Sequence, residues 1–265
     1  MTAKHAIITG GSSGIGLAIA KCLANTGWQI TLIARNTERL NQATLSLNIP
    51  DERIQHFTAD VTDQNTLNQS ITQSIESFGA PELLVTSAGI AHPGHFQELE
   101  SNVFQEAMAI NYFGTLYAIQ AVAPTMRKAR KGHIVMISSG AALIGVYGYS
   151  AYCPSKFAVR GLAEVLRAEF KPDDVNVSIV YPPDTQTPQL EQENKTKPKE
   201  TFAISGNAKT WQADNVAKII MKGIEKNQFS ITPGLEMTAL ERLGSLINPL
   251  LRRYFDSLVL KVRKS

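Results

Sequence analysis

Tyr152 and Lys156 are the two residues whose types and spacing most directly predict chemistry. If a helix begins near residue 151, residues four apart share one face, and the lysine ammonium lies beside the phenol. A neighbouring cation favours the phenolate and lowers the pKa of a tyrosine from about 10. Such a tyrosine can donate and accept protons near neutral pH. The same spacing also arises by chance on helix surfaces, so it needs support from the rest of the chain.

A glycine-rich turn between the first apolar run and the first helical pattern supplies that support. It reads Thr9-Gly10-Gly11-Ser12-Ser13-Gly14-Ile15-Gly16. Glycines permit a tight turn, a close approach of the backbone to a pyrophosphate, and close packing of the helix on the sheet. The helix N-terminus adds free N–H groups and the positive end of its dipole. The turn therefore predicts a dinucleotide site.

The end of the second apolar run bears on which dinucleotide binds. A cofactor without a 2′-phosphate is usually held here by an acidic residue that accepts hydrogen bonds from the ribose hydroxyls. This chain has Ala34 in that place, followed by Arg35. A guanidinium can pair with the 2′-phosphate of the adenosine, whereas a carboxylate would repel it. The sequence therefore favours NADPH over NADH.

Short apolar runs that alternate with longer helical patterns must position these residues. The strand candidates are 5–9, 29–34, 54–59, 83–87, 133–138, 176–181 and 229–232. The helical patterns are 15–26, 38–47, 64–78, 102–129, 151–169 and 213–225. Continuous apolar strands between helices indicate a parallel sheet covered on both faces. We therefore expect one Rossmann-type, doubly wound α/β domain over 1–234, with about seven strands and helices on both faces.

Composition and charge argue against several other classes of protein. The chain has 265 residues, 43% of them hydrophobic, which suffices for one large core. A net charge of +3 without a basic block does not indicate nucleic-acid binding, and two distant cysteines do not indicate a metal site. We read no secretory signal and no apolar run near the ~20 residues that cross a bilayer. A cytoplasmic location is expected.

Taken together, these residues resemble the short-chain dehydrogenase/reductase family over about residues 4–232. The resemblance rests on the glycine-rich turn and on Asn111, Ser139, Tyr152 and Lys156. It implies that Ser139 polarises a substrate carbonyl, that Tyr152 protonates its oxygen, and that Lys156 tunes Tyr152 and bonds the nicotinamide ribose. It further implies that Asn111 holds a water that relays protons to Lys156.

The same resemblance extends the set of expected cofactor contacts beyond the glycine-rich turn. Asp60 and Val61 would contact the adenine, and Thr185 and Thr187 would lie near the nicotinamide carboxamide and the pyrophosphate. The full expected set is Gly10, Ser12, Ser13, Gly14, Ile15, Gly16, Arg35, Asp60, Val61, Ala88, Gly89, Tyr152, Lys156, Pro182, Thr185 and Thr187.

Two positions depart from the family pattern. Ser87 stands where the family has asparagine, and Pro183 stands where it has glycine after Pro182. The first change removes an amide that steadies the cofactor site, and the second removes a backbone donor. Neither affects the proton-transfer residues, so an active enzyme is still expected.

Segments 155–164, 181–188 and 193–201 resemble the 3-ketodihydrosphingosine reductases within that family. Those enzymes use NADPH to reduce the 3-keto group of a sphingoid base to dihydrosphingosine, so the resemblance implies a lipid ketone as substrate. Two alternatives stay open. One is an NADPH-linked reductase of a steroid, fatty-acyl or small ketone. The other is a dinucleotide-binding regulator without turnover, against which the complete proton-transfer set argues.

Two segments of the chain depart from the alternation of strands and helices. Residues 184–210 are polar and follow a strand end, which predicts a mobile substrate lid, with its charges either solvated or in contact with a head group. In 235–265, apolar and basic residues recur at helical spacing, and Pro249 is expected to divide the tail into two helices. The tail would lie in a membrane interface, on the body or on a second subunit. We expect a homo-oligomer, either a dimer or a tetramer.

Overall fold

Seven parallel strands form the central sheet of the computed structural model, in the order β3-β2-β1-β4-β5-β6-β9. The structure describes residues 3–205 and 210–264, so residues 206–209 of the predicted lid and Ser265 of the predicted tail lie outside the described residues. The strands are β1 (His5–Thr9), β2 (Gln29–Ala34), β3 (Ile54–Thr58), β4 (Leu83–Thr86), β5 (Gly132–Ile137), β6 (Val175–Val180) and β9 (Ser230–Ile231).

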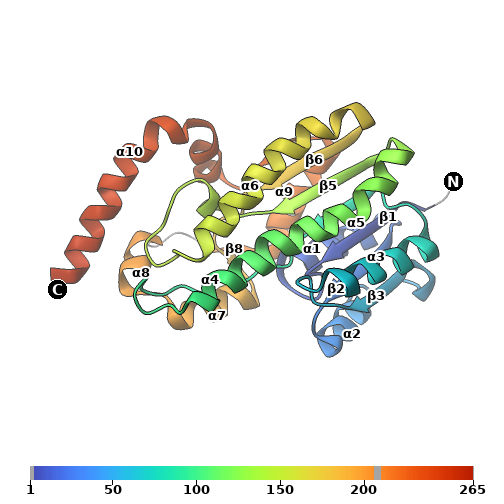
Figure 1. Cartoon of the computed structure of the whole chain (residues 1–265), viewed down its shortest axis with the longest axis horizontal. Helices are drawn as coiled ribbons and strands as arrows, with labels where there is room; N and C mark the ends of the chain where they lie inside the picture. Colours follow the sequence, from blue (N-terminus) through green and yellow to red (C-terminus); the bar gives the residue numbers. More distant parts are fainter. Residues whose placement is uncertain (1–2, 206–209, 265) are drawn as a thin grey trace.

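Helices cover both faces of this sheet, as Figure 1 shows. Successive side chains of a strand point to opposite faces, so Ile8 joins the core beneath α1, α2 and α9, whereas Ile7 joins the core beneath α3, α5 and α6. This arrangement confirms the predicted doubly wound fold. The helices are α1 (Gly14–Ala24), α2 (Thr37–Ser46), α3 (Gln64–Phe78), α4 (Ser101–Met108), α5 (Gly114–Ala129), α6 (Tyr152–Glu169) and α9 (Ala213–Glu225).

The long helical pattern predicted over 102–129 is interrupted in the structure. A π-helical turn, Ala109–Phe113, lies between α4 and α5 and contains Asn111. Single π turns inside helices are frequent at functional sites, because the wider turn changes the direction of one side chain and the bonding of one carbonyl. Short 3-10 turns occupy Asp51–Arg53, Gly140–Ala142 and Lys171–Asp173.

The segment predicted as a polar lid is more ordered than its composition suggested. It contains β7 (Thr185–Gln186), α7 (Pro188–Thr196) and α8 (Lys199–Ser205), and β7 pairs with β8 (Trp211–Gln212). The start of α7 has a clear local cause: Thr187 Oγ1 accepts a hydrogen bond from the Leu190 N–H at 3.2 Å, and Pro188 occupies the first turn. We call this segment, 184–205, the lid.

The C-terminal tail is one helix, α10 (Leu235–Lys264), so the prediction of two helices separated at Pro249 is wrong. A proline inside a helix removes one backbone hydrogen bond and commonly bends the helix without ending it. Figure 1 shows that α10 changes direction along its length before it reaches the C-terminus. The Asn248 amide ties its middle to the Leu143 carbonyl at 3.1 Å. No helix within 3–205 or 210–264 is long and apolar enough to span a bilayer.

Candidate active site

The glycine-rich turn lies at the carboxyl end of β1, next to β4, where the strand order reverses. Ligands of doubly wound sheets bind at this switch point. Gly10 and Gly14 have φ values of +67° and +56°, and a Cβ on Gly10 would lie 2.5 Å from the Ala88 nitrogen. A Cβ on Gly16 would lie 2.6 Å from the Gly10 carbonyl oxygen. The turn thus forms a cradle that a side chain would fill.

This cradle fits a dinucleotide pyrophosphate. Within the described chain, the side chain of Ser13 makes no capping hydrogen bond at the start of α1. The first N–H groups of α1 are therefore directed at the space in front of the turn, where a phosphate would accept from them. The lid approaches from the other side, since a Cβ on Gly14 would lie 3.0 Å from the Thr187 methyl group. The structure therefore brings Thr187 to the turn, as the resemblance implied.

Pro182 and Thr185, which were also expected at the cofactor, lie in the loop after β6 and in β7 at the start of the lid. Thr185 is buried and donates to the Pro183 carbonyl at 2.7 Å, so its hydroxyl is already engaged. The Pro182 carbonyl accepts from the Gly140 N–H at 3.1 Å, which joins the loop after β6 to the loop after β5. A backbone hydrogen bond thus holds together the two loops that flank the reaction centre.

Arg35 and Asp60 form the adenosine end of the candidate cofactor site. Arg35 follows β2, Asp60 follows β3, and Arg35 Nη1 lies 3.7 Å from Asp60 Oδ2 in an exposed ion pair. The guanidinium is therefore open to solvent at the end of β2, where a 2′-phosphate could pair with it. Val61 is buried and packs against Gly114.

The predicted catalytic residues come together at the carboxyl end of β5 and the start of α6. Ser139 follows β5 and hydrogen-bonds to the Tyr152 hydroxyl, while its Oγ also accepts from the Ala141 N–H at 3.1 Å. Lys156 lies one turn further along α6, with Nζ 5.6 Å from the centre of the Tyr152 ring. Its ammonium donates to the Ile137 carbonyl at 3.1 Å.

The electrostatics of this group differ from the prediction. Burial raises the pKa of Tyr152 and the nearby Glu193 carboxylate adds to the rise, while hydrogen bonds from Ser139 and Gln189 oppose it. Burial lowers the pKa of Lys156 to about 8, with Glu193 opposing. The predicted lowering of the Tyr152 pKa by Lys156 is therefore wrong, because spacing alone does not show how deeply the phenol is buried.

The Asn111 side chain connects separate segments of the site through hydrogen bonds. Its Oδ1 accepts from the Ile90 N–H at 2.8 Å, and its Nδ2 donates to the Ile90 carbonyl at 2.9 Å and to Ser155 Oγ at 2.8 Å. The amide therefore joins the π-helical turn to α6 and to the loop after β4. Gly89 lies between Asn111 and Lys156, since a Cβ there would be 3.1 Å from Asn111 Oδ1 and 3.4 Å from Lys156 Nζ. The predicted water relay stays a prediction.

Three residues at the site were missed by the sequence analysis. Glu193 is buried, and it accepts from the Tyr149 hydroxyl at 2.7 Å and from Gln189 Nε2 at 2.8 Å. A signal was available, because Thr187-Pro188 is a typical helix start and would have placed Gln189 and Glu193, four apart, on one face. The polar composition of the segment indicated a loop instead.

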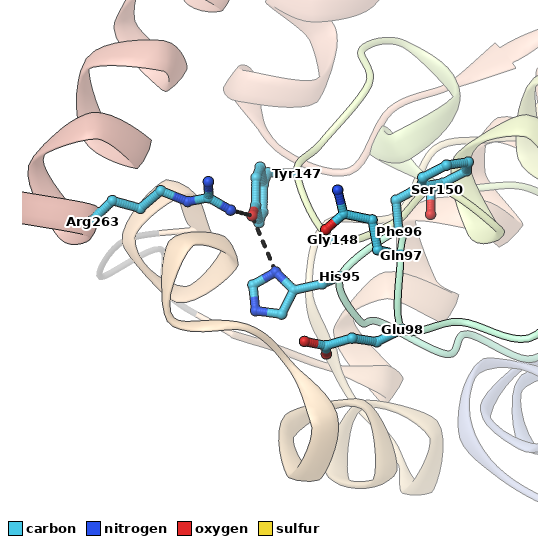
Figure 2. Close-up of a pocket in the computed structure, with 8 residues that line it drawn as sticks. All are labelled: His95, Phe96, Gln97, Glu98, Tyr147, Gly148, Ser150 and Arg263. Atoms are coloured by element: carbon cyan, nitrogen blue, oxygen red, sulfur yellow. Dashed lines mark hydrogen bonds between the residues drawn. The ribbon is translucent and has the colours of Figure 1, made fainter.

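Two cavities flank this region. One, of about 360 Å³, is lined mainly by apolar groups, among them Val146, Cys153, Phe255 and Val259. The other, of about 350 Å³, lies between the end of α10 and the body. Figure 2 shows the Tyr147 hydroxyl between Arg263 and His95, with hydrogen bonds of 2.7 Å and 3.1 Å.

Comparison with known proteins agrees with this geometry. A family model described as short chain dehydrogenase matches residues 4–198. The chain belongs to the short-chain dehydrogenase family. The matched region includes the glycine-rich turn and the Ser139, Tyr152 and Lys156 group, so the family resemblance found in the sequence is confirmed.

Among the relatives of this short-chain dehydrogenase is the 3-ketodihydrosphingosine reductase of Dictyostelium discoideum. It is 38% identical over 97% of this chain and 82% of its own length. The protein of the same name from Mus musculus is 43% identical over 87% of this chain and 71% of its own length.

Solved structures show the same fold. ElxO with NADP bound is 27% identical, has a TM-score of 0.77, and matches 87% of this chain and 97% of its own. A short-chain dehydrogenase/reductase from Burkholderia phymatum in complex with NAD has a TM-score of 0.83 at 23% identity, covering 94% of this chain and 95% of its own. At that identity, the second likeness bears on the fold alone.

Proposed function

We propose that this short-chain dehydrogenase reduces 3-ketodihydrosphingosine, a 3-keto sphingoid base, to dihydrosphingosine with NADPH. The observation that carries the proposal is the group of Ser139 and the buried Tyr152 and Lys156 at the carboxyl end of β5 and the start of α6. The substrate is supported by relatives named 3-ketodihydrosphingosine reductase, which match at 38% and 43% identity over most of both chains.

The choice of cofactor is supported by two features of this chain. The glycine cradle before α1 suits a pyrophosphate, and Arg35 presents a guanidinium where a 2′-phosphate would lie. ElxO, which is 27% identical, has been solved with NADP bound. When bound, NADPH supplies the hydride that reduces the carbonyl carbon.

The residues of the chain would then handle the carbonyl oxygen. Tyr152 starts as a neutral phenol, because burial raises its pKa, and it donates its proton to the oxygen as negative charge develops there. The Ser139 hydroxyl, bonded to the same phenol, donates to that oxygen and orients it. Lys156 is held by the Ile137 carbonyl and by its place on α6, from which its cationic form favours the phenolate left after proton transfer.

The apolar cavity of about 360 Å³ supports a lipid substrate over a small polar ketone. It is lined by Tyr149 and Cys153, which belong to the same buried cluster as the catalytic Tyr152, and it extends to Phe255 and Val259 of α10. An alkyl chain that leaves the reaction centre through this cavity would bury its methylene groups against these side chains.

The first prediction concerns the substrate. Purified protein mixed with NADPH and 3-ketodihydrosphingosine in detergent micelles is expected to oxidise the cofactor, as followed by loss of the absorbance of the reduced nicotinamide. A steroid ketone, a fatty-acyl ketone and a small ketone are the controls. Oxidation with one of these alone would favour the alternative carbonyl reductase, and cofactor binding without any turnover would favour a regulator.

We also propose that α10 rests on a lipid surface. Four of its exposed apolar side chains, Leu243, Leu246, Leu250 and Tyr254, recur every three or four residues, and Leu260 follows near the end of the helix. They are accompanied by the basic residues Arg242, Arg252, Arg253, Lys261, Arg263 and Lys264. A basic amphipathic helix can lie in a membrane interface, where a sphingoid ketone would be found. The predicted homo-oligomer and cytoplasmic location stay predictions.

Sedimentation with vesicles tests this surface. The protein is expected to co-sediment with anionic phosphatidylserine vesicles. The double variant Leu246→Glu/Leu250→Glu is expected to bind about tenfold more weakly, since it loses two exposed leucines that would insert into the bilayer. The matched control is Leu45→Glu, which charges an equally exposed leucine on α2. Equal binding of the double variant and the control would remove α10 from this role.

A further inference from the structure

A buried carboxylate stands at the reaction centre without an ionic partner. Glu193 is 7% exposed, and its two hydrogen-bond donors, Tyr149 and Gln189, are both neutral. Within the described ranges 3–205 and 210–264, no lysine, arginine or histidine forms an ion pair with it. Lys197 of the lid has a buried side chain, and its Nζ lies 3.9 Å from Asp184 Oδ2. Lys156 interacts with Glu193 electrostatically but forms no ion pair with it.

This carboxylate is close to the reacting groups. Gln189 hydrogen-bonds to Tyr152 and also donates to Glu193 Oε1 at 2.8 Å, so one side-chain amide spans the distance between the phenol and the carboxylate. Tyr149, the second donor to Glu193, has its ring centre 5.6 Å from that of Tyr152. A ligand oxygen on Tyr152 would therefore have Glu193 within reach of its neighbouring atoms.

A negative charge in this place is costly in two ways. Both hydrogen-bond donors to Glu193 are neutral, and Lys156 interacts with it electrostatically without forming an ion pair, so much of the lost hydration of the carboxylate stays uncompensated. The charge also disfavours the Tyr152 phenolate, which makes the phenol a weaker acid for the proposed proton transfer. Both costs fall if a cation enters the site, and each carboxylate oxygen keeps a lone pair for one more donor.

We propose that Glu193 is the binding site for an ammonium group that the substrate carries on the carbon next to its ketone. This deepens the proposed function and rests on it, because 3-ketodihydrosphingosine has an amine on that carbon, whereas steroid and fatty-acyl ketones do not. The carbonyl oxygen contacts Tyr152 and Ser139 while the ammonium contacts Glu193. Since the ammonium neutralises the carboxylate, binding of the correct ketone also makes Tyr152 a better proton donor.

The test compares two ketones on one set of proteins. The ketones are 3-ketodihydrosphingosine and the desamino analogue of equal chain length, in which hydrogen replaces the amine. The proteins are wild type, Glu193→Gln, which keeps the shape of the side chain without its charge, and the matched control Glu191→Gln on the exposed side of α7. Binding of NADPH, measured by fluorescence, checks that each variant folds.

Glu193→Gln is expected to lower kcat/KM for the amino ketone by about 30-fold, as removal of one partner of a buried charge pair does. With the desamino ketone, kcat/KM is expected not to fall, because the neutral side chain no longer disfavours the Tyr152 phenolate. Glu191→Gln is expected to behave as wild type with both ketones. A role of Glu193 in lid packing alone would lower both activities together, and that result, or no loss at all, would overturn the proposal.

A second measurement needs no variant. Wild type is expected to prefer the amino ketone over the desamino ketone by about the same 30-fold, with part of the difference in kcat. Equal activity with the two ketones would reject the ammonium site while leaving the proposed reduction intact. Failure of the proposed function has a different signature, because wild type would then leave the amino ketone unreduced.

Discussion

Replacing Tyr152 with phenylalanine is expected to lower the turnover number by about 1000-fold, since a positioned general acid contributes about 10²- to 10⁴-fold. The change removes the proton donor and keeps the ring, which is buried and packs against Tyr149. Steady-state oxidation of NADPH with the sphingoid ketone measures the loss. Cofactor affinity, measured by fluorescence titration, is expected to stay nearly unchanged, because the glycine cradle and Arg35 lie elsewhere.

The matched control for this variant is Tyr254→Phe, which removes a hydroxyl from the exposed part of α10. It is expected to retain full activity in detergent. A Tyr152→Phe protein that remains fully active would show that the proton comes from another group, and the mechanism built on the buried phenol would then be rejected.

The second large effect concerns cofactor choice. Arg35→Asp is expected to lower the ratio of kcat/KM with NADPH to kcat/KM with NADH by about 100-fold, because it replaces a charge-assisted bond to the 2′-phosphate with repulsion. The new carboxylate also stands beside Asp60, the present partner of Arg35. Without a 2′-phosphate, the ribose hydroxyls can donate to it, so activity with NADH is expected to fall less or to rise.

Arg39→Asp provides the control, since it makes the same change in charge four residues further on, in the first turn of α2. Its effect on the cofactor ratio is expected to be much smaller, because an exposed charge at a distance is screened by salt. Parallel measurements with both cofactors decide the point. An unchanged ratio in Arg35→Asp would contradict the assignment of Arg35.

The sheet could be predicted from the sequence because its central strands, β1, β4 and β5 among them, are buried on both faces. Burial of this kind leaves a continuous apolar run in the chain, and each of the seven predicted runs overlaps a strand within one or two residues of its ends. The glycine-rich turn was equally visible. Its glycines are required by close backbone contacts, such as that of Gly10 with Ala88, which leave no room for a side chain.

The lid and the electrostatics of the site could not be predicted in the same way. Helix α7 is polar in composition, and the burial of Glu193 depends on Tyr149, which lies 44 residues away in the chain. The pKa of Tyr152 likewise depends on the groups packed around it, which the spacing to Lys156 does not reveal. The π-helical turn at Asn111 left no periodic signal, because one extra residue in a turn is lost in a long helical pattern.

The ion pair between Arg263 and Glu200 would couple the proposed lipid-binding surface of α10 to the lid over the candidate active site. Arg263 donates to Glu200 at 3.2 Å and to the Tyr147 hydroxyl, so the last turn of α10 is fastened to the lid. If a bilayer displaces this turn, the energy of opening the lid changes as well. Thermodynamic linkage then requires reciprocity: whatever factor a membrane applies to ligand affinity, the ligand applies to membrane affinity. Saturation with substrate would thus change the affinity of the protein for the bilayer by that same factor.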